Sequence, residues 1–71
     1  MANEFQERRA YDSNGRLEYY GQSEPGTREN EEKWMIERYS YSGINEDSKK
    51  YPNGSNANTF VWSNRTNYKY R

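Results

Sequence analysis

At the centre of this 71-residue chain stands the run Lys33-Trp34-Met35-Ile36-Glu37-Arg38-Tyr39-Ser40-Tyr41. Successive side chains of a strand point to opposite faces, so Trp34 and Ile36 share one face with Arg38. The other face takes Met35, Glu37, Tyr39 and Tyr41. Large side chains on both faces indicate a strand that is covered on both sides, or covered on one side and bound to a partner on the other.

The segment before this run predicts a β-hairpin over residues 7–21. Two strand-like stretches, residues 5–11 and 16–21, are separated by Asp12-Ser13-Asn14-Gly15. Asn-Gly between two such stretches is the strongest short-range hairpin signal, because both residues tolerate a positive φ. In the second stretch, one face takes Leu17 and Tyr19 and the other takes Glu18 and Tyr20.

Residues 22–33 form the longest polar stretch and predict a solvated connection. Pro25-Gly26 favours a turn, since Pro sets φ for the first central position and Gly takes the left-handed one. Thr27 is a suitable cap for a short helical turn over residues 28–33, but that segment has no apolar stripe to pack. We therefore expect at most one short helical turn here.

The rest of the chain predicts further short strands. A weaker arm is expected over residues 44–51, and Pro52-Asn53-Gly54-Ser55 predicts another turn. The run 59–62 predicts a strand that breaks at residues 63–65, and residues 66–71 then alternate, with Tyr68 and Tyr70 on one face and Lys69 and Arg71 on the other. We predict a single all-β domain over residues 1–71, a small antiparallel meander or sandwich of five or six short strands.

Composition excludes several classes of protein. The apolar fraction is 30%, against roughly 45–50% in ordinary globular chains, and the mean hydropathy is −1.65. No run approaches the ~20 apolar residues that a membrane-spanning helix needs, and the first residues lack the apolar centre of a secretory signal. We therefore expect neither a membrane anchor nor secretion.

Catalysis and metal binding are not expected either. The chain has neither Cys nor His, which removes thiol catalysis, disulfides, the usual general base and the commonest metal ligand. Acidic residues cluster in polar segments without the spacing of a calcium loop: Glu29, Glu31 and Glu32, and again Glu46 and Asp47. We predict no enzymatic activity, no cofactor and no small-molecule substrate.

Aromatic residues make up 17% of the chain, including eight Tyr and two Trp. They bury large areas while Tyr and Trp keep a polar tip in water, which suits thin sheets and interfaces. Because aromatic anchors dominate interface energetics, we predict six contact residues for a partner: Trp34, Tyr39, Tyr41, Trp62, Tyr68 and Tyr70. For Trp34 and Trp62 an alternative stays open: together with Ile36 and Phe60 they form the internal core.

Charge balance bears on the kind of partner. Eleven basic and eleven acidic residues give a net charge of zero, whereas nucleic-acid-binding chains normally carry a basic excess. Tyrosines near Arg38, Lys69 and Arg71 are suited to stacking single-stranded bases, but acidic residues are interleaved with them. Single-stranded nucleic-acid binding is therefore the less favoured alternative.

Several short motifs follow one another along nearly the whole chain. They are Tyr11-Asp12-Ser13-Asn14-Gly15, Tyr19-Tyr20-Gly21, Pro25-Gly26-Thr27, Trp34-Met35-Ile36, Val61-Trp62-Ser63-Asn64-Arg65 and Tyr68-Lys69-Tyr70. In this order they resemble a group of very small proteins encoded among the virion genes of tailed bacteriophages. Where those proteins often have Asp-Asp before the Arg, this chain has Ser63-Asn64, so an ion pair of Arg65 with those positions is lost.

The resemblance implies a structural or accessory protein of a phage particle, such as a capsid decoration or a neck or tail component. The expected partners are other virion proteins or copies of the chain itself, and the expected location is the virion, after synthesis in the cytoplasm of the infected bacterium. Open sheet edges fit this role, since such edges are either protected or paired with another chain. A small phage-encoded module that binds one soluble host protein stays open as an alternative.

Overall fold

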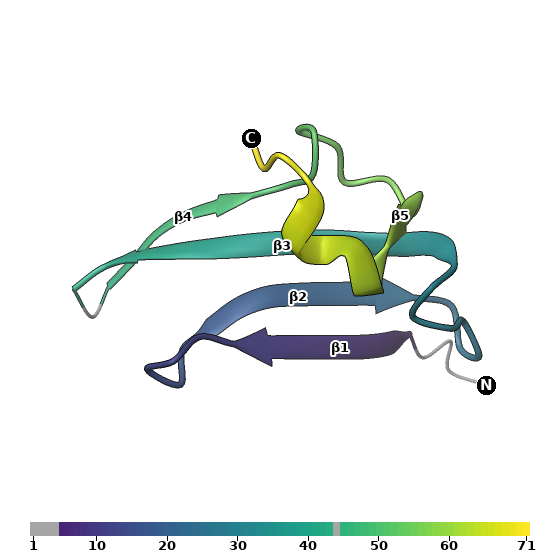
Figure 1. Cartoon of the computed structure of the whole chain (residues 1–71), viewed down its shortest axis with the longest axis horizontal. Helices are drawn as coiled ribbons and strands as arrows, with labels where there is room; N and C mark the ends of the chain where they lie inside the picture. The colour runs from purple at the N-terminus through teal and green to yellow at the C-terminus, as the bar shows by residue number, and fades with distance from the viewer. Residues whose placement is uncertain (1–4, 44) are drawn as a thin grey trace.

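The structure, a computed structural model, describes residues 5–43 and 45–71. Within these residues the chain forms five strands and one short 3₁₀ helix: β1 (Gln6–Tyr11), β2 (Leu17–Ser23), β3 (Glu32–Ser42), β4 (Asn45–Lys50), β5 (Phe60–Val61) and η1 (Trp62–Asn67) (Figure 1). The strands are antiparallel, in the order β1-β2-β3-β4, and β5 also pairs with β3. The predicted small all-β fold is confirmed.

Strand β3 is the element around which the sheet is built. It pairs with β2 along residues 35–38, with β4 along residues 38–42, and with β5 through Glu32 and Trp34. Its 11 residues are long enough for all three strands, since the mean strand has ~5–6 residues. The predicted strand of residues 33–41 therefore extends by one residue at each end.

The turn between β1 and β2 differs in detail from the prediction. Only Gly15 of the Asn-Gly pair has a positive φ, at 79°. The turn depends instead on the Asp12 carboxylate, whose Oδ1 accepts the backbone N–H of Asn14 and that of Arg16, each at 2.9 Å. Such side-chain bonds to nearby backbone N–H groups are how Asp stabilises turns.

The connection between β2 and β3 is shorter and better packed than predicted. It covers residues 24–31 and contains no helix. Its turn at residues 28–31, where the Glu31 N–H donates to the Arg28 carbonyl at 3.1 Å, stays within the predicted limit of one short turn. The Trp34 Nε1–H donates to the carbonyl of Arg28 at 2.8 Å, and the Ser63 N–H donates to the carbonyl of Glu29 at 3.0 Å. Arg8 forms an ion pair with Glu29 at 2.8 Å. The polar connection is thus held against β1, β3 and η1.

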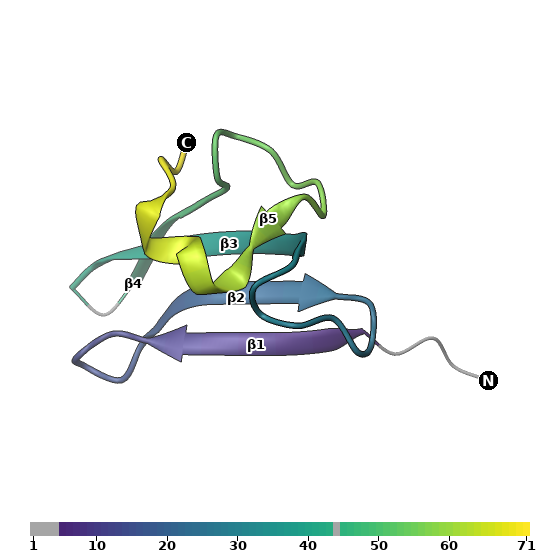
Figure 2. The same ribbon diagram turned by 45° about the vertical axis from the view of Figure 1, so that its right-hand side comes forward.

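The C-terminal part departs most from the prediction. The expected strand of residues 59–62 is reduced to Phe60–Val61, and the chain turns at Trp62 into η1, which lies over one side of the sheet (Figure 2). A helical segment over residues 62–67 was not predicted. Instead of a strand over residues 66–71, Tyr70 forms one isolated bridge with Pro52.

The core lies between the sheet and η1. Its buried members are Tyr19, Trp34, Ile36 and Trp62, with Ala10, Phe60, Tyr68 and Tyr70 packed around them. Three aromatic pairs fill most of it, with ring centroids 5.2–5.9 Å apart: Tyr19–Tyr70, Trp34–Trp62 and Phe60–Tyr68. Tyr68 and Tyr70 share one side, as predicted, and that side faces the core, while Lys69 and Arg71 are exposed.

The described molecule is thin. Its principal dimensions are 39 × 26 × 18 Å, and packed layers of a protein lie ~10 Å apart. The shortest dimension therefore fits a sheet with one covering layer.

Candidate interaction surface

The two faces of the sheet are different. One, the covered face, carries Tyr19, Gly21, Trp34 and Ile36 and packs against η1. The alternate residues of the same strands point to the opposite side, over which no described element lies (Figures 1 and 2). We call this side the open face and define it by Glu7, Arg9, Tyr20, Gln22, Met35, Glu37, Tyr39 and Lys49.

The side chains of the open face are ordered by contacts with one another. On β1 and β2, the Tyr20 hydroxyl donates to the Glu7 carboxylate at 2.6 Å. The Arg9 guanidinium lies 5.2 Å from the centroid of the Tyr20 ring and 3.2 Å from Glu7. The three residues form one connected unit, in which the register places Arg9 directly opposite Tyr20.

A second unit of the same kind lies on β3 and β4. The Tyr39 hydroxyl donates to the Glu37 carboxylate at 2.5 Å, and the Lys49 ammonium lies 3.9 Å from Glu37. Tyr20 is directly opposite Glu37, so the two units are adjacent. The open face therefore carries two tyrosines, two carboxylates and two cations, and its formal charges cancel.

These contacts shift the protonation of the groups involved. Burial, and then the hydrogen bond to Glu7, raises the pKa of Tyr20 to about 12. The same hydrogen bond from Tyr20 holds the pKa of Glu7 below its ordinary value. Burial and the hydrogen bond to Glu37 likewise raise the pKa of Tyr39. At neutral pH both tyrosines are neutral donors, so the open face presents fixed phenol rings.

The six predicted contact residues occupy three different places. Trp34 and Trp62 are 0% and 4% exposed and belong to the core of the chain itself. Tyr68 and Tyr70 are partly buried against that core, where the Tyr68 hydroxyl accepts the Val61 N–H and the Tyr70 hydroxyl donates to the Arg65 carbonyl. None of these four residues, Trp34, Trp62, Tyr68 and Tyr70, lies on the open face.

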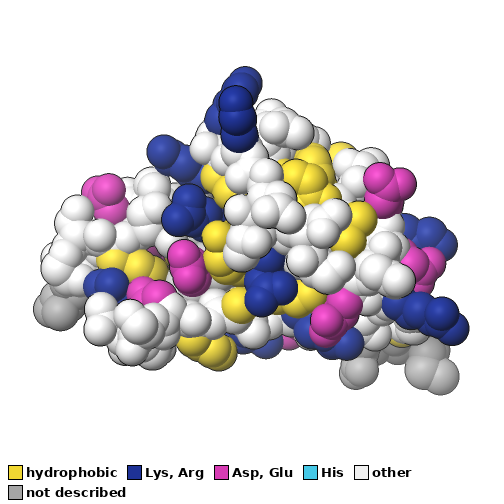
Figure 3. Space-filling view, in the orientation of Figure 1, with side chains coloured by type: hydrophobic (Ala, Val, Ile, Leu, Met, Phe, Trp, Pro, Cys, Tyr) yellow, Lys and Arg dark blue, Asp and Glu magenta, His cyan; other side chains and the backbone are white. Residues whose placement is uncertain are grey.

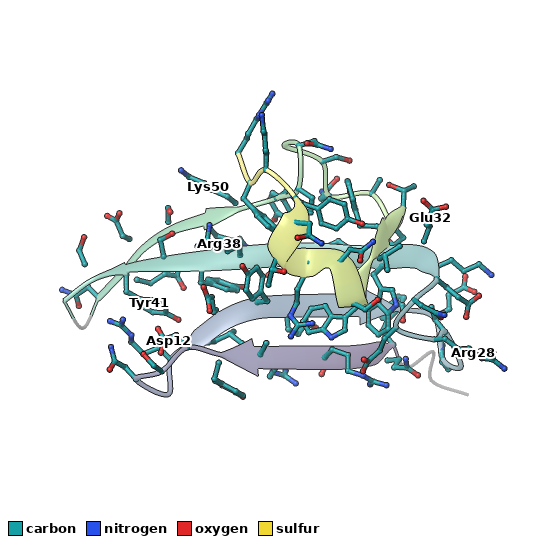
Figure 4. All side chains as sticks on the ribbon, viewed as in Figure 1. Asp12, Arg28, Glu32, Arg38, Tyr41 and Lys50 are labelled. Carbon is teal, nitrogen blue, oxygen red and sulfur yellow. The ribbon has the colours of Figure 1, made fainter. Side chains whose placement is uncertain are left out.

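The two remaining contact residues, Tyr39 and Tyr41, are on β3. Tyr39 is on the open face, as described above. Tyr41 lies at the same end of the sheet as Asp12 (Figure 4), where its hydroxyl donates to the Leu17 carbonyl at 2.6 Å. The Arg16 guanidinium lies 4.7 Å from the Tyr41 ring centroid and donates to the Gly43 carbonyl, so Arg16 joins the two hairpin turns.

Sequence reasoning missed most of the open face. It identified Tyr39 but not Tyr20, Glu7, Arg9 or Met35 as candidate contact residues. The alternation in residues 16–21 does place Tyr20 on the face opposite Tyr19, and Met35 shares its parity with Tyr39. What the pattern did not indicate is which of the two faces the C-terminal segment covers.

The covered face has a cluster of arginines over aromatic rings. The guanidinium carbons of Arg38 and Arg65 each lie 5.8 Å from the Tyr19 ring centroid, and that of Arg65 lies 4.6 Å from Trp62. On this side of the molecule basic and acidic side chains are interspersed around the apolar ones (Figure 3). The Tyr19 and Trp62 rings, which base stacking here would need, are therefore already in cation–π range of arginines of the chain itself.

The other candidate sites bring together fewer interacting polar and aromatic groups than the open face does. A hollow of about 430 Å³ is lined by Phe5, Glu24, Thr27, Lys33 and Asn58, with one acid and one amine but no nucleophile assembled with a base. Among the described residues, no three acidic side chains are grouped so that they could hold a metal ion. No helix in residues 5–43 and 45–71 is long and apolar enough to cross a membrane.

The geometry therefore points to the open face as the surface with the most organised recognition chemistry. Comparison of the chain with protein-family models, with curated proteins and with solved structures gave no match.

Proposed function

We propose that this chain is a structural or accessory protein of a bacteriophage particle and that it binds a neighbouring virion protein through its open face. The observation that carries the proposal is the open face itself: two ordered tyrosines and a half-buried methionine on a sheet face that no described element covers. The phage setting is supported by the order of motifs that resembles small virion-associated proteins.

The composition of the open face suits protein binding. Tyrosine, arginine and methionine are enriched in interfaces relative to the rest of a protein surface, and the open face has Tyr20, Tyr39, Arg9 and Met35. Its formal charges cancel, so a partner meets no net charge that it must neutralise. An interface of this kind is held by shape, ring packing and hydrogen bonds.

The fixed side-chain conformations of the open face favour binding as well. Tyr20 and Tyr39 are each fixed by a hydrogen bond to a carboxylate of the same face. Side chains that are already fixed lose less conformational entropy on association, which otherwise costs ~0.5–1.5 kcal/mol for each immobilised side chain. The two rings are therefore pre-organised anchors.

The size of the molecule is sufficient for a specific interface. Its two longer dimensions, 39 and 26 Å, enclose an area above the ~800 Å² that each partner contributes to a standard interface. A chain with few apolar residues gains stability when such a face is covered, and a symmetric particle would cover it at every copy.

The test is the amount of chain in purified particles. We expect quantitative mass spectrometry of virions from the infected or induced host to find the wild-type chain in a fixed ratio to the major capsid or tail protein. Met35→Arg places a charge in the middle of the open face and should reduce incorporation strongly. Thr66→Arg, on the exposed surface of η1, is the matched control and should be incorporated like the wild type.

Two results would contradict the proposal in different ways. Virions that lack the chain would exclude the particle role, and co-purification with a single host protein would then support the host-binding module. Equal incorporation of Met35→Arg and Thr66→Arg, with both variants folded, would show that another surface makes the contact.

A further inference from the structure

Strand β1 forms a free edge of the sheet. It pairs with β2 on one side, and among the described residues no backbone hydrogen bond joins its other side to another segment. An edge of this kind presents a row of unpaired N–H and C=O groups to any strand that can match it.

The opposite edge, β4, is better protected against pairing. It reads Asn45-Glu46-Asp47-Ser48-Lys49-Lys50, with four charged residues against three in β1. The register shift in its pairing with β3, between Ser40 and Tyr41, falls inside the ladder, whereas that of β1 with β2 falls before the last residue of β1. Charged residues and irregular register are the features by which natural proteins prevent edge pairing. The two edges are therefore not equivalent, and β1 is the one suited to pairing.

The side chains around β1 support this difference. The two large hydrophobic residues that are most exposed in the described chain are Phe5, at 56%, and Tyr11, at 59%. Phe5 immediately precedes β1, and Tyr11 is its last residue. Exposed rings thus stand at both ends of the free edge.

We infer that β1 pairs antiparallel with β1 of a second copy, in the register centred on Arg8. This register brings Glu7 opposite the partner's Arg9 and Phe5 opposite the partner's Tyr11, and the two-fold symmetry repeats each pair. Because the pairing is made by the backbone edge of β1, it does not depend on the proposed function, although its charge pairs use Glu7 and Arg9, which also belong to the open face.

The register follows from geometry and charge. In a strand, alternate residues direct their N–H and C=O groups to the same edge, so a two-fold β1–β1 ladder must pair residues of equal parity. Centring it on Arg9 places Arg9 opposite the partner's Arg9, and centring it on Glu7 places Glu7 opposite the partner's Glu7. Like charges directly opposite are unfavourable, whereas opposite charges and aromatic pairs stabilise a ladder. Of these three registers, only the one centred on Arg8 provides both.

The one like-charge pair in this register is Arg8 with the partner's Arg8. Within its own chain, Arg8 forms an ion pair with Glu29 at 2.8 Å, and its guanidinium lies 5.6 Å from the Trp34 ring centroid. Its charge is therefore compensated within the chain, as those of Glu7 and Arg9 also are, and it lies toward the covered side. What distinguishes this register is the two Glu7–Arg9 pairs that it adds between the copies.

Pairing at β1 would join two sheets into one that continues from β4 of one copy to β4 of the other. The open faces of both copies would then lie on the same side of the joined sheet, because residues of equal parity pair. The result is a two-fold symmetric dimer in which the two open faces form one continuous surface.

The first experiment is a charge exchange, read by analytical ultracentrifugation of the full chain. We expect the wild type to form a dimer, and Glu7→Arg and Arg9→Glu each to weaken it by about tenfold, because each places like charges opposite one another at two positions. The double variant Glu7→Arg/Arg9→Glu should restore the dimer. Lys50→Glu, on β4, is the control and should not change the dissociation constant.

The second experiment tests the register by cross-linking, since the chain has no cysteine. Under mild oxidation Arg8→Cys should give a disulfide-linked dimer, because the two introduced thiols would be direct cross-strand neighbours. Arg9→Cys and Glu7→Cys should cross-link much less. A monomeric wild type at all concentrations would overturn the inference, and so would faster cross-linking of Arg9→Cys or Glu7→Cys than of Arg8→Cys.

Discussion

Trp62 lies directly on the backbone of Gly21. A Cβ atom at residue 21 would be 2.5 Å from Trp62 Cε3 and 2.7 Å from its Cζ3. Gly21 is in the middle of β2 and pairs with both Arg8 and Ile36, so the sheet cannot easily move away from the indole. The contact explains why a glycine stands inside a strand, where it has little conformational advantage.

Gly21→Ala should therefore destabilise the fold by about 1–3 kcal/mol, the usual cost of extra volume in a packed core. The measurement is urea unfolding followed by tryptophan fluorescence. Gln22→Ala, the neighbour on the open face, is the control and should change stability much less. Equal stability of both variants would mean that Trp62 is not held against β2.

Arg16→Lys should loosen the end of the sheet where the two hairpin turns meet. The Arg16 guanidinium pairs with Asp12 at 3.1 Å, donates to the Gly43 carbonyl at 2.6 Å and lies over the Tyr41 ring. Lysine keeps the charge but lacks the planar fork, so we expect a loss of about 1–2 kcal/mol. Hydrogen exchange should increase at residues 12–17 and 41–43, while Arg71→Lys should leave it unchanged.

The free energy of unfolding should fall at acid pH because a small set of carboxyl groups becomes protonated. Backbone N–H donors hold the pKa of Asp12 and that of Glu31 below their ordinary values, and the Tyr20 hydroxyl does the same for the pKa of Glu7. A folded-state pKa below the unfolded one stabilises the fold above the ordinary carboxyl range, and this stabilisation is lost as the pH falls through the folded-state pKa.

The check is the urea midpoint measured from neutral pH down to strongly acid pH. Asp12→Asn should have a flatter acid profile than the wild type, because its side chain no longer titrates. Asn45→Ala, on the exposed β4 strand, removes no titrating group and should keep the wild-type profile. A wild-type profile for Asp12→Asn would show that the carboxylate charge is not used in the turn.

Tyr20 should titrate late at alkaline pH. Its pKa is raised from 10 to about 12, first by burial and then by the hydrogen bond to Glu7. The folded state thus binds this proton more tightly than the unfolded state does. The associated stability is complete below pH 10 and is lost as the pH rises toward 12.

Tyrosinate absorbance across this range measures the effect. Tyr20→Phe should remove one late-titrating group, and Glu7→Gln should shift that group to lower pH without removing it. Gln22→Ala, a change on the open face that removes no titrating group, is the control and should leave the late part of the titration curve unchanged. If Tyr20→Phe also leaves the late part of the titration curve unchanged, the late-titrating group is not the Tyr20 hydroxyl.

The strands could be predicted from the sequence because their signals are local. Alternation of Trp34 and Ile36 with Met35 and Tyr39 identified β3 and its two faces, and the turn at residues 12–15 identified the hairpin. Alternation also placed Tyr68 and Tyr70 on one side, though not that this side faces the core. These features depend on near neighbours, which a single sequence does show.

The segment from Trp62 onward could not be predicted in the same way. A 3₁₀ helix of six residues has no long apolar period, and η1 is positioned by distant contacts: Trp62 on Gly21 and the Ser63 N–H on the Glu29 carbonyl. Because this segment decides which sheet face is covered, the open face could not be assigned either. The contact residues Trp34 and Trp62 were ambiguous for the same reason.

The dependence of the core on residues 60–70 also has a consequence for synthesis on the ribosome. The β1–β2 hairpin leaves the ribosome with Tyr19 and Ala10 in water, and Trp62 is made 39 residues after Ser23. At ~5–20 residues per second this interval is about 2–8 s, long compared with the microseconds in which a hairpin forms. During that time the side of the nascent sheet that η1 later covers is exposed. Its aromatic residues are therefore accessible to chaperones until Trp62 and the residues after it have left the ribosome.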